Sequence, residues 1–122
     1  MQRKVLIVED DPLFADDTKT ALELSSAVPY NVLIAASGSQ ALAQYRANKD
    51  TSLVILDTDL NPTNEKGWNV YDQLKTEGYT GLALARSARG LQPEWIDRNI
   101  PFLDKSASDT ELENTIDRLY QR

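Results

Sequence analysis

The chain has 122 residues and a net charge of −6, which suits a single domain and argues against nucleic acid or an anionic membrane as a direct partner. It contains no cysteine and no histidine, which excludes disulfide frameworks, thiolate or imidazole zinc sites, and catalysis by either side chain. Any chemistry must therefore use carboxylates, hydroxyls and amines. The longest apolar run, residues 32–36, is too short for a membrane span or a signal peptide, so we expect a cytoplasmic protein.

Four apolar runs, at residues 5–8, 32–36, 53–56 and 82–85, predict β-strands. The runs are continuous rather than alternating, which is typical of strands that are covered on both faces of a parallel sheet. A shorter run at residues 101–104 is the fifth candidate. Segments with helical spacing separate the runs, so we expect an α/β fold: a doubly wound, flavodoxin-like parallel sheet of five strands in the order 2-1-3-4-5.

Residues that cap free backbone amides mark the helix starts. Asp11 stands directly before a proline, the arrangement of an N-cap followed by proline in the first turn. Ser37 and Ser108 each have a Gln or Glu three residues later, which is the spacing of a capping box. A third helix is expected at about residues 67–77. The fourth should be short or irregular, because few residues separate its flanking strands and Pro93 is among them.

Polar side chains gather where the predicted strands end. Glu9 and Asp10 follow the first strand, Asp57 ends the third, Ser87 follows the fourth, and Lys105 follows the fifth. The carboxyl ends of parallel strands meet at one edge of the sheet, so these groups should share a cleft. Clustered carboxylates repel one another unless a cation neutralises them, and Mg²⁺ prefers carboxylates together with water and phosphate oxygens. The pattern predicts a magnesium site that accepts a phosphoryl group.

These residues also carry a resemblance to a known family. Four motifs, each at a strand end and in the right order, closely resemble those of the receiver domain of two-component response regulators: Val-Leu-Ile-Val-Glu9-Asp10-Asp, Leu-Val-Ile-Leu-Asp57, Leu-Ala-Arg-Ser87-Ala88 and Phe102-Leu-Asp-Lys105. Each motif alone is common, whereas the ordered set is specific. The resemblance extends over essentially the whole chain, so we expect one receiver domain over residues 1–122.

The resemblance implies a phosphoacceptor site. Asp57 would take a phosphoryl group from the phosphohistidine of a histidine kinase or histidine phosphotransfer protein. Asp57 and Asp10 would bind Mg²⁺ directly, Glu9 would bind it through water, and Asp59 would contribute its backbone carbonyl. Lys105 would pair with a phosphoryl oxygen. The chain would then be a signalling phosphoacceptor that acts on itself, not an enzyme with an external product.

The resemblance also implies a switch. The Ser87 hydroxyl would bind the phosphoryl group, and Phe102 would turn inward as that hydroxyl is recruited, unless Phe102 is simply a core residue. The change would alter the binding of an unknown output partner. Arg89 is expected to form an ion pair with Asp59 that partly covers the site and slows the approach of water.

Two positions depart from the family pattern. Lys105 is followed by serine where the family usually has proline in a cis peptide, so we expect a trans peptide bond. Arg86 stands where an apolar residue is expected. A buried arginine needs a partner, so we expect this side chain at the rim of the site, in solvent or on a carboxylate.

Two other functions stay open. The run Val-Ile-Leu-Asp57-Thr-Asp59 also resembles the first motif of haloacid-dehalogenase-type phosphatases, in which the second aspartate is the general acid. In that family the motif normally follows the first strand, and here it follows the third. A phosphorylation-independent interaction module with a receiver-like fold is the other alternative, compatible with the short fourth helix and the missing proline.

Overall fold

The computed structural model describes residues 2–25 and 28–121. Its main sheet has five parallel strands in the order β2-β1-β3-β6-β7, which confirms the predicted topology. Three of the continuous apolar runs form the inner strands β1, β3 and β6, the fourth forms the edge strand β2, and β3 is buried along its whole length. The strands are β1 (Arg3–Val8), β2 (Tyr30–Ala35), β3 (Leu53–Asp57), β6 (Leu82–Ser87) and β7 (Phe102–Asp104).

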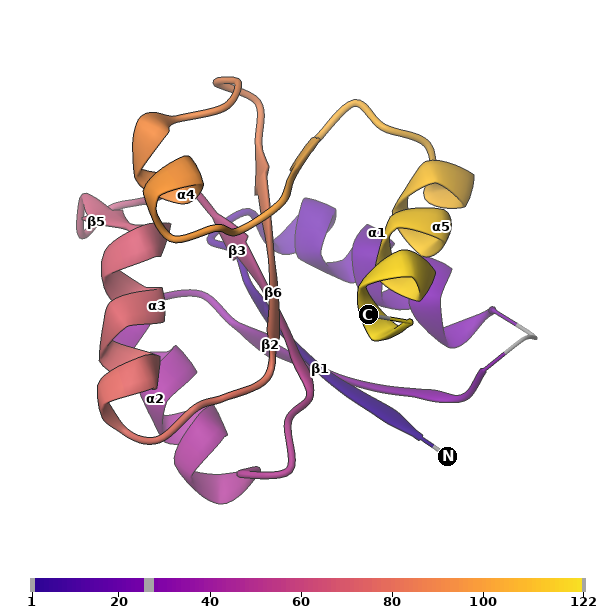
Figure 1. Cartoon of the computed structure of the whole chain (residues 1–122), viewed down its shortest axis with the longest axis horizontal. Helices are drawn as coiled ribbons and strands as arrows, with labels where there is room; N and C mark the ends of the chain where they lie inside the picture. Colours follow the sequence, from indigo (N-terminus) through magenta and orange to yellow (C-terminus); the bar gives the residue numbers. More distant parts are fainter. Residues whose placement is uncertain (1, 26–27, 122) are drawn as a thin grey trace.

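Helices cover both faces of this sheet (Figure 1). One face packs against α1 and α5, and the other against α2, α3 and α4, so the core is divided into two apolar clusters. None of the helices in the described ranges is long and apolar enough to span a membrane. The helices are α1 (Pro12–Glu23), α2 (Gly38–Ala47), α3 (Gly67–Thr76), α4 (Pro93–Asp97) and α5 (Asp109–Tyr120).

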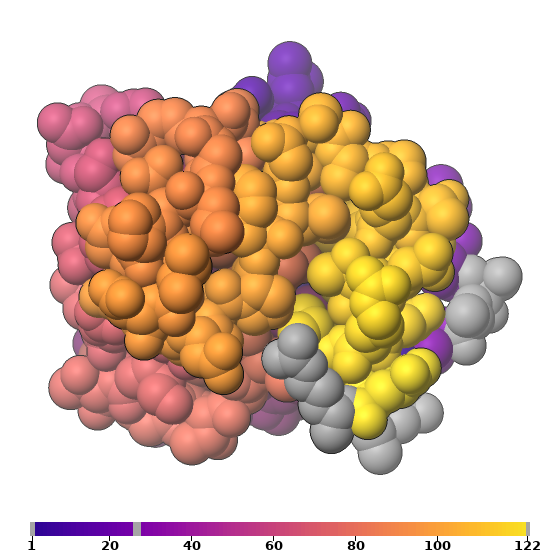
Figure 2. Space-filling view, turned by 45° about the horizontal axis from the view of Figure 1, so that its top comes forward, coloured from indigo at the N-terminus to yellow at the C-terminus, as the bar shows by residue number. Residues whose placement is uncertain are grey.

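The predicted caps are present. The Asp11 side chain accepts hydrogen bonds from two backbone N–H groups of the first turn of α1, and the hydroxyls of Ser37 and Ser108 each accept one, in the first turns of α2 and α5. The helix α4 has only five residues, as expected, and its N-cap residue makes no side-chain cap. Its central residue, Trp95, is fully buried and packs edge-on against Trp68 of α3. In Figure 2, α4 and α5 occupy one continuous face of the molecule, with the β7 segment between them.

A two-stranded hairpin lies between β3 and α3, and the sequence pattern did not predict it. Its strands are β4 (Asp59–Leu60) and β5 (Glu65–Lys66), paired antiparallel. Asn64 in the connecting turn has a positive φ of 61°, a conformation that asparagine tolerates better than most residues. The hairpin ends at Gly67, where a Cβ atom would come within 1.9 Å of the Asp57 carbonyl oxygen. Only glycine fits this close return of the chain to β3.

Candidate functional site

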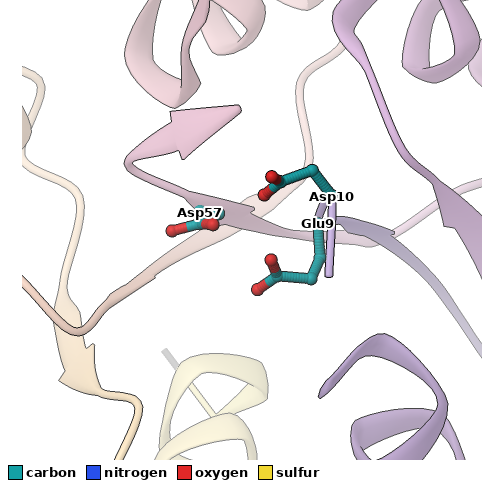
Figure 3. Close-up of side chains that lie close together, drawn as sticks. All are labelled: Glu9, Asp10 and Asp57. Carbon is teal, nitrogen blue, oxygen red and sulfur yellow. The ribbon is translucent and has the colours of Figure 1, made fainter. Parts of the chain in front are cut away.

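Three carboxylates meet at the carboxyl end of the sheet. Glu9 and Asp10 follow β1, and Asp57 ends the neighbouring strand β3; the two strands are in register at Val8 and Leu56. Each carboxylate offers an oxygen that lies within 4.8 Å of the others. Figure 3 shows the side chains of Glu9 and Asp10 directed toward Asp57. Parallel pairing thus brings together acids that are far apart in the sequence, as the strand-end pattern indicated.

Lys105 joins this cluster from the loop between β7 and α5. Its Nζ donates a hydrogen bond to Oδ2 of Asp57 at 3.1 Å and lies 2.7 Å from Oε1 of Glu9. Glu9 and Asp57 are 4% and 8% exposed, so both carboxylates are largely removed from water. One ammonium group therefore faces two buried acids, which leaves negative charge in the site.

Burial dominates the electrostatics of these acids. It raises the pKa of Glu9 to about 7, and the hydrogen bond from Lys105 offsets only part of that shift. Burial likewise raises the pKa of Asp57, against the lowering effects of its hydrogen bond with Glu9 and of Lys105. A divalent cation would relieve the repulsion, and three carboxylates within reach of one another form the hard oxygen donor set that suits Mg²⁺.

The acids open into a cavity of about 220 Å³, which Ser87 and Ala88 of β6 and its following loop also line. The Ser87 side chain is buried, and its Oγ accepts a hydrogen bond from the backbone N–H of Arg89 at 3.0 Å. The hydroxyl hydrogen of Ser87 remains available for an acceptor in the cavity. A larger cavity, about 580 Å³, opens near Arg3 and Tyr120 at the opposite end of the sheet, away from this chemistry.

The Asp59 side chain is held by two cations. Arg89 Nε donates to its Oδ2 at 2.7 Å, which is the ion pair expected from the sequence, and Lys66 of the hairpin binds the other carboxylate oxygen. The hydrogen bond from Lys66 is the largest of the effects that lower the pKa of Asp59. The hairpin also contacts the acid cluster, since the backbone N–H of Asn61 donates to Asp10 at 3.2 Å. A ligand role for the Asp59 backbone carbonyl stays a prediction.

The prediction for Arg86 was wrong. Its side chain is 4% exposed and lies beneath the site instead of at the rim. Nη2 donates to the backbone carbonyls of Asp104 at 3.1 Å and Lys105 at 3.4 Å, and the guanidinium carbon lies 5.1 Å from the centre of the Phe14 ring. Carbonyl oxygens and an aromatic face thus take the place of the solvent or carboxylate that we expected around the guanidinium group.

Two further expectations concern the strand β7. The Lys105–Ser106 peptide is trans, as expected for a bond that does not precede proline. Phe102 is partly buried and packs against the core cluster on the α2, α3 and α4 side of the sheet. This position is compatible with a core residue and with a movable one, so the switch role of Phe102 stays a prediction.

Sequence reasoning assigned no contact with the site to three residues that make one: Phe14, Asn61 and Lys66. Phe14 had a usable signal, because it lies in the first turn of a helix that begins beside the acidic residues. Asn61 contributes a backbone N–H, so its side-chain identity carries no signal. Lys66 reaches Asp59 only because the hairpin folds back, which no local pattern indicated.

Comparisons with known proteins place the chain in a family and show solved structures with a similar fold. The family model described as the response regulator receiver domain matches residues 5–116. A comparison with curated protein sequences finds no match. Among solved structures, a putative response regulator from Chloroflexus aurantiacus is similar with a TM-score of 0.85 and 23% identity, covering 100% of both chains.

Two further structures share the fold. The signal receiver domain of a putative Luxo repressor protein from Vibrio parahaemolyticus has a TM-score of 0.83 and 21% identity, covering 100% of this chain and 92% of that one. A CheY-like response regulator receiver domain protein from Methanospirillum hungatei has a TM-score of 0.82 and 20% identity, covering 97% and 93%. With the family match over nearly the full length, the chain belongs to the response regulator receiver domain family.

Proposed function

We propose that this receiver domain is a phosphoacceptor whose Asp57 takes a phosphoryl group from a phosphohistidine and thereby changes the binding of an output partner. The observation that carries the proposal is the meeting of three carboxylates with the Lys105 ammonium in one cavity. The donor would be a histidine kinase or a histidine phosphotransfer protein, as membership of the receiver family suggests. The domain acts on itself and releases no product other than its own phosphate.

The chemistry requires little covalent work from the protein. An ionised Asp57 oxygen attacks phosphorus as the phosphorus–nitrogen bond of the donor breaks, and the departing imidazole keeps that electron pair and takes up a proton. Lys105, already 3.1 Å from Asp57, favours the ionised form of this carboxylate against the effect of burial and then faces the incoming phosphoryl oxygens. The Ser87 hydroxyl, which already accepts from Arg89, has its hydrogen free to donate to the phosphoryl group.

Glu9, Asp10 and Asp57 would hold Mg²⁺, which supplies charge neutralisation to the phosphoryl oxygens when bound. This donor set consists of hard oxygens only, with no sulfur or nitrogen ligand among the three. The two buried acids, Glu9 and Asp57, have raised pKa values because of their burial, so a bound cation would also favour their ionised forms.

The phosphatase alternative fits the site less well. A haloacid-dehalogenase-type mechanism needs the second aspartate of the motif, Asp59, as a general acid that carries a proton near neutral pH. Lys66 and Arg89 both bind this carboxylate and lower its pKa. Asp59 is therefore held as a carboxylate, a state that suits an ion pair over the site and opposes proton donation.

The test is modification by a small phosphoryl donor. The purified protein is incubated with acetyl phosphate and Mg²⁺, and the covalent product is detected by intact-protein mass spectrometry. We expect one added phosphoryl group in the wild type, none in Asp57→Asn, and none when Mg²⁺ is removed by a chelator. A phosphorylation-independent interaction module would show no Mg²⁺-dependent product in any variant. A phosphatase would turn over a phosphate monoester, and Asp59→Asn would abolish that turnover.

A further inference from the structure

We propose that Arg86 is a positioning residue that presets the Lys105 ammonium for the phosphoryl group. This inference rests on the proposed phosphoacceptor function and goes beyond it, because Arg86 does not line the cavity that holds the acids. Its side chain leaves the sheet on the face covered by α1 and α5, the face on which Leu84, two residues earlier, packs. Arg86 therefore acts from beneath the site.

The first observation is where the guanidinium group donates. Nη2 reaches the carbonyl oxygen of Asp104 at 3.1 Å and that of Lys105 at 3.4 Å. These two carbonyls lie on either side of the Lys105 α-carbon, so one nitrogen holds the backbone on both sides of the lysine. The loop from β7 into α5 is thereby tied to β6, one residue before Ser87.

The second observation is a shared aromatic surface. The Phe14 ring centre lies 4.7 Å from Nζ of Lys105 and 5.1 Å from the guanidinium carbon of Arg86. Both cations are attracted to the negative face of the same ring. Phe14 thus limits where the Lys105 ammonium can move, while Arg86 fixes the position of the backbone from which that side chain extends.

The third observation is that the Arg86 charge is buried, which is unfavourable for folding. Arg86 is almost fully buried, its burial lowers its pKa, and within the described residues its Nε has no hydrogen-bond partner. An apolar side chain of similar size at such a position is usually at least as favourable for folding as a buried charge. We therefore expect arginine to contribute little to stability here, and its two carbonyl contacts point to a different use, which is to hold Lys105 in place.

A double-mutant cycle tests the inference. Arg86→Met keeps the length of the side chain and removes its charge and donors, and Lys105→Met removes the group that Arg86 is proposed to position. Arg118→Met is the matched control, because Arg118 is exposed on α5 and, among residues 2–25 and 28–121, its side chain donates to Thr115 of the same helix alone. Phosphorylation rates are measured with acetyl phosphate and Mg²⁺, and stability is measured by urea unfolding.

We expect Arg86→Met to lower the phosphorylation rate about tenfold, since small misplacements of a catalytic group are costly. Arg118→Met should stay within about twofold of the wild type, and Arg86→Met should be no less stable than the wild type. In the Lys105→Met background, Arg86→Met should cause no further loss of rate. An unchanged rate in Arg86→Met, or an equal loss in both backgrounds, would overturn the inference.

An NMR measurement separates this inference from the proposed function. The Phe14 ring shifts the signals of the nearby Lys105 methylene groups, so these signals should move toward random-coil values in Arg86→Met. Unmoved signals would refute the positioning role even if the wild type is phosphorylated. Moved signals in a protein that takes no phosphoryl group would refute the function and leave the positioning role standing. If Arg86→Met does not fold, Arg86→Leu, which likewise lacks the charge and the donors, replaces it in both measurements.

Discussion

Removing the side-chain oxygen of Thr58 should loosen α4. Thr58 directly follows the proposed phosphoacceptor, and its Oγ1 accepts a hydrogen bond from Nε1 of Trp95 at 3.0 Å. Both side chains are 0% exposed. The helix α4 has five residues and no side-chain N-cap, and this bond ties it to the residue that follows β3. We choose Thr58→Val, which keeps the shape of the side chain and removes only the acceptor.

The size of the stability loss in Thr58→Val follows from the burial of the Trp95 N–H group. Thr58→Val leaves the Trp95 N–H in the core without a partner, and an unsatisfied buried donor costs about 1–3 kcal/mol. The free energy of unfolding of a domain is typically about 5–15 kcal/mol, so this loss is a large fraction of the stability of the protein. The valine methyl fills the space of the hydroxyl, so the loss reflects the hydrogen bond and not a cavity.

The assay is urea unfolding followed by circular dichroism. Thr18→Val is the matched control, because the Thr18 hydroxyl donates to the Phe14 carbonyl within α1. Removing that hydroxyl leaves no buried donor without a partner, so we expect the free energy of unfolding to fall by less than about 0.5 kcal/mol. Trp95→Phe removes the donor that Thr58 satisfies. If Thr58→Val costs as much in the Trp95→Phe background as in the wild type, the hydrogen bond does not explain the loss.

Three other predictions concern the surroundings of the site. Gly67→Ala should cost more than about 2 kcal/mol in urea unfolding, because its Cβ would lie 1.9 Å from the Asp57 carbonyl oxygen; a variant of wild-type stability would contradict this. Arg89→Ala should shorten the lifetime of the aspartyl phosphate several-fold, because its ion pair with Asp59 covers the site; an unchanged half-life measured by mass spectrometry would end that idea. In the absence of divalent cations, the raised pKa of Glu9, about 7, means that the folded protein binds more protons than the unfolded chain, so this contribution to stability should fall as pH rises from about 4.5 to about 7. The stability difference between wild type and Glu9→Gln should change with pH in that window, and a constant difference would refute the assignment.

The sheet order and most of the helix starts could be predicted because their signals are local. A continuous apolar run predicts a covered strand wherever it occurs, and Asp11, Ser37 and Ser108 satisfy amides within their own first turns. The meeting of Glu9 and Asp57 also followed, because parallel strands align their carboxyl ends. Each of these features depends on one short segment or on one rule of topology.

The features that sequence reasoning missed depend on contacts between distant segments. Arg86 of β6 is buried against the Phe14 ring of α1 and the backbone carbonyls of Asp104 and Lys105 at the end of β7, so its surroundings come from segments far apart in the sequence. The hairpin is held by Lys66 on Asp59 and by Glu65, whose carboxylate accepts from the backbone N–H of Gly38. The strands β4 and β5 are short and joined by a polar turn, and such a segment has the composition of an ordinary loop, so the sequence did not indicate that these two strands pair.

The contact between Glu65 and Gly38 links the hairpin to α2. Gly38 is the first residue of that helix, and its N–H would otherwise lack an intrahelical acceptor, while the negative carboxylate is well placed at the positive end of the helix dipole. Displacing the hairpin would remove the Glu65 carboxylate from the first N–H group of α2. Opening of the hairpin and fraying of the start of α2 are therefore thermodynamically coupled. Amide hydrogen exchange should register the coupling: a change that frees the hairpin accelerates exchange in the first turn of α2 as well.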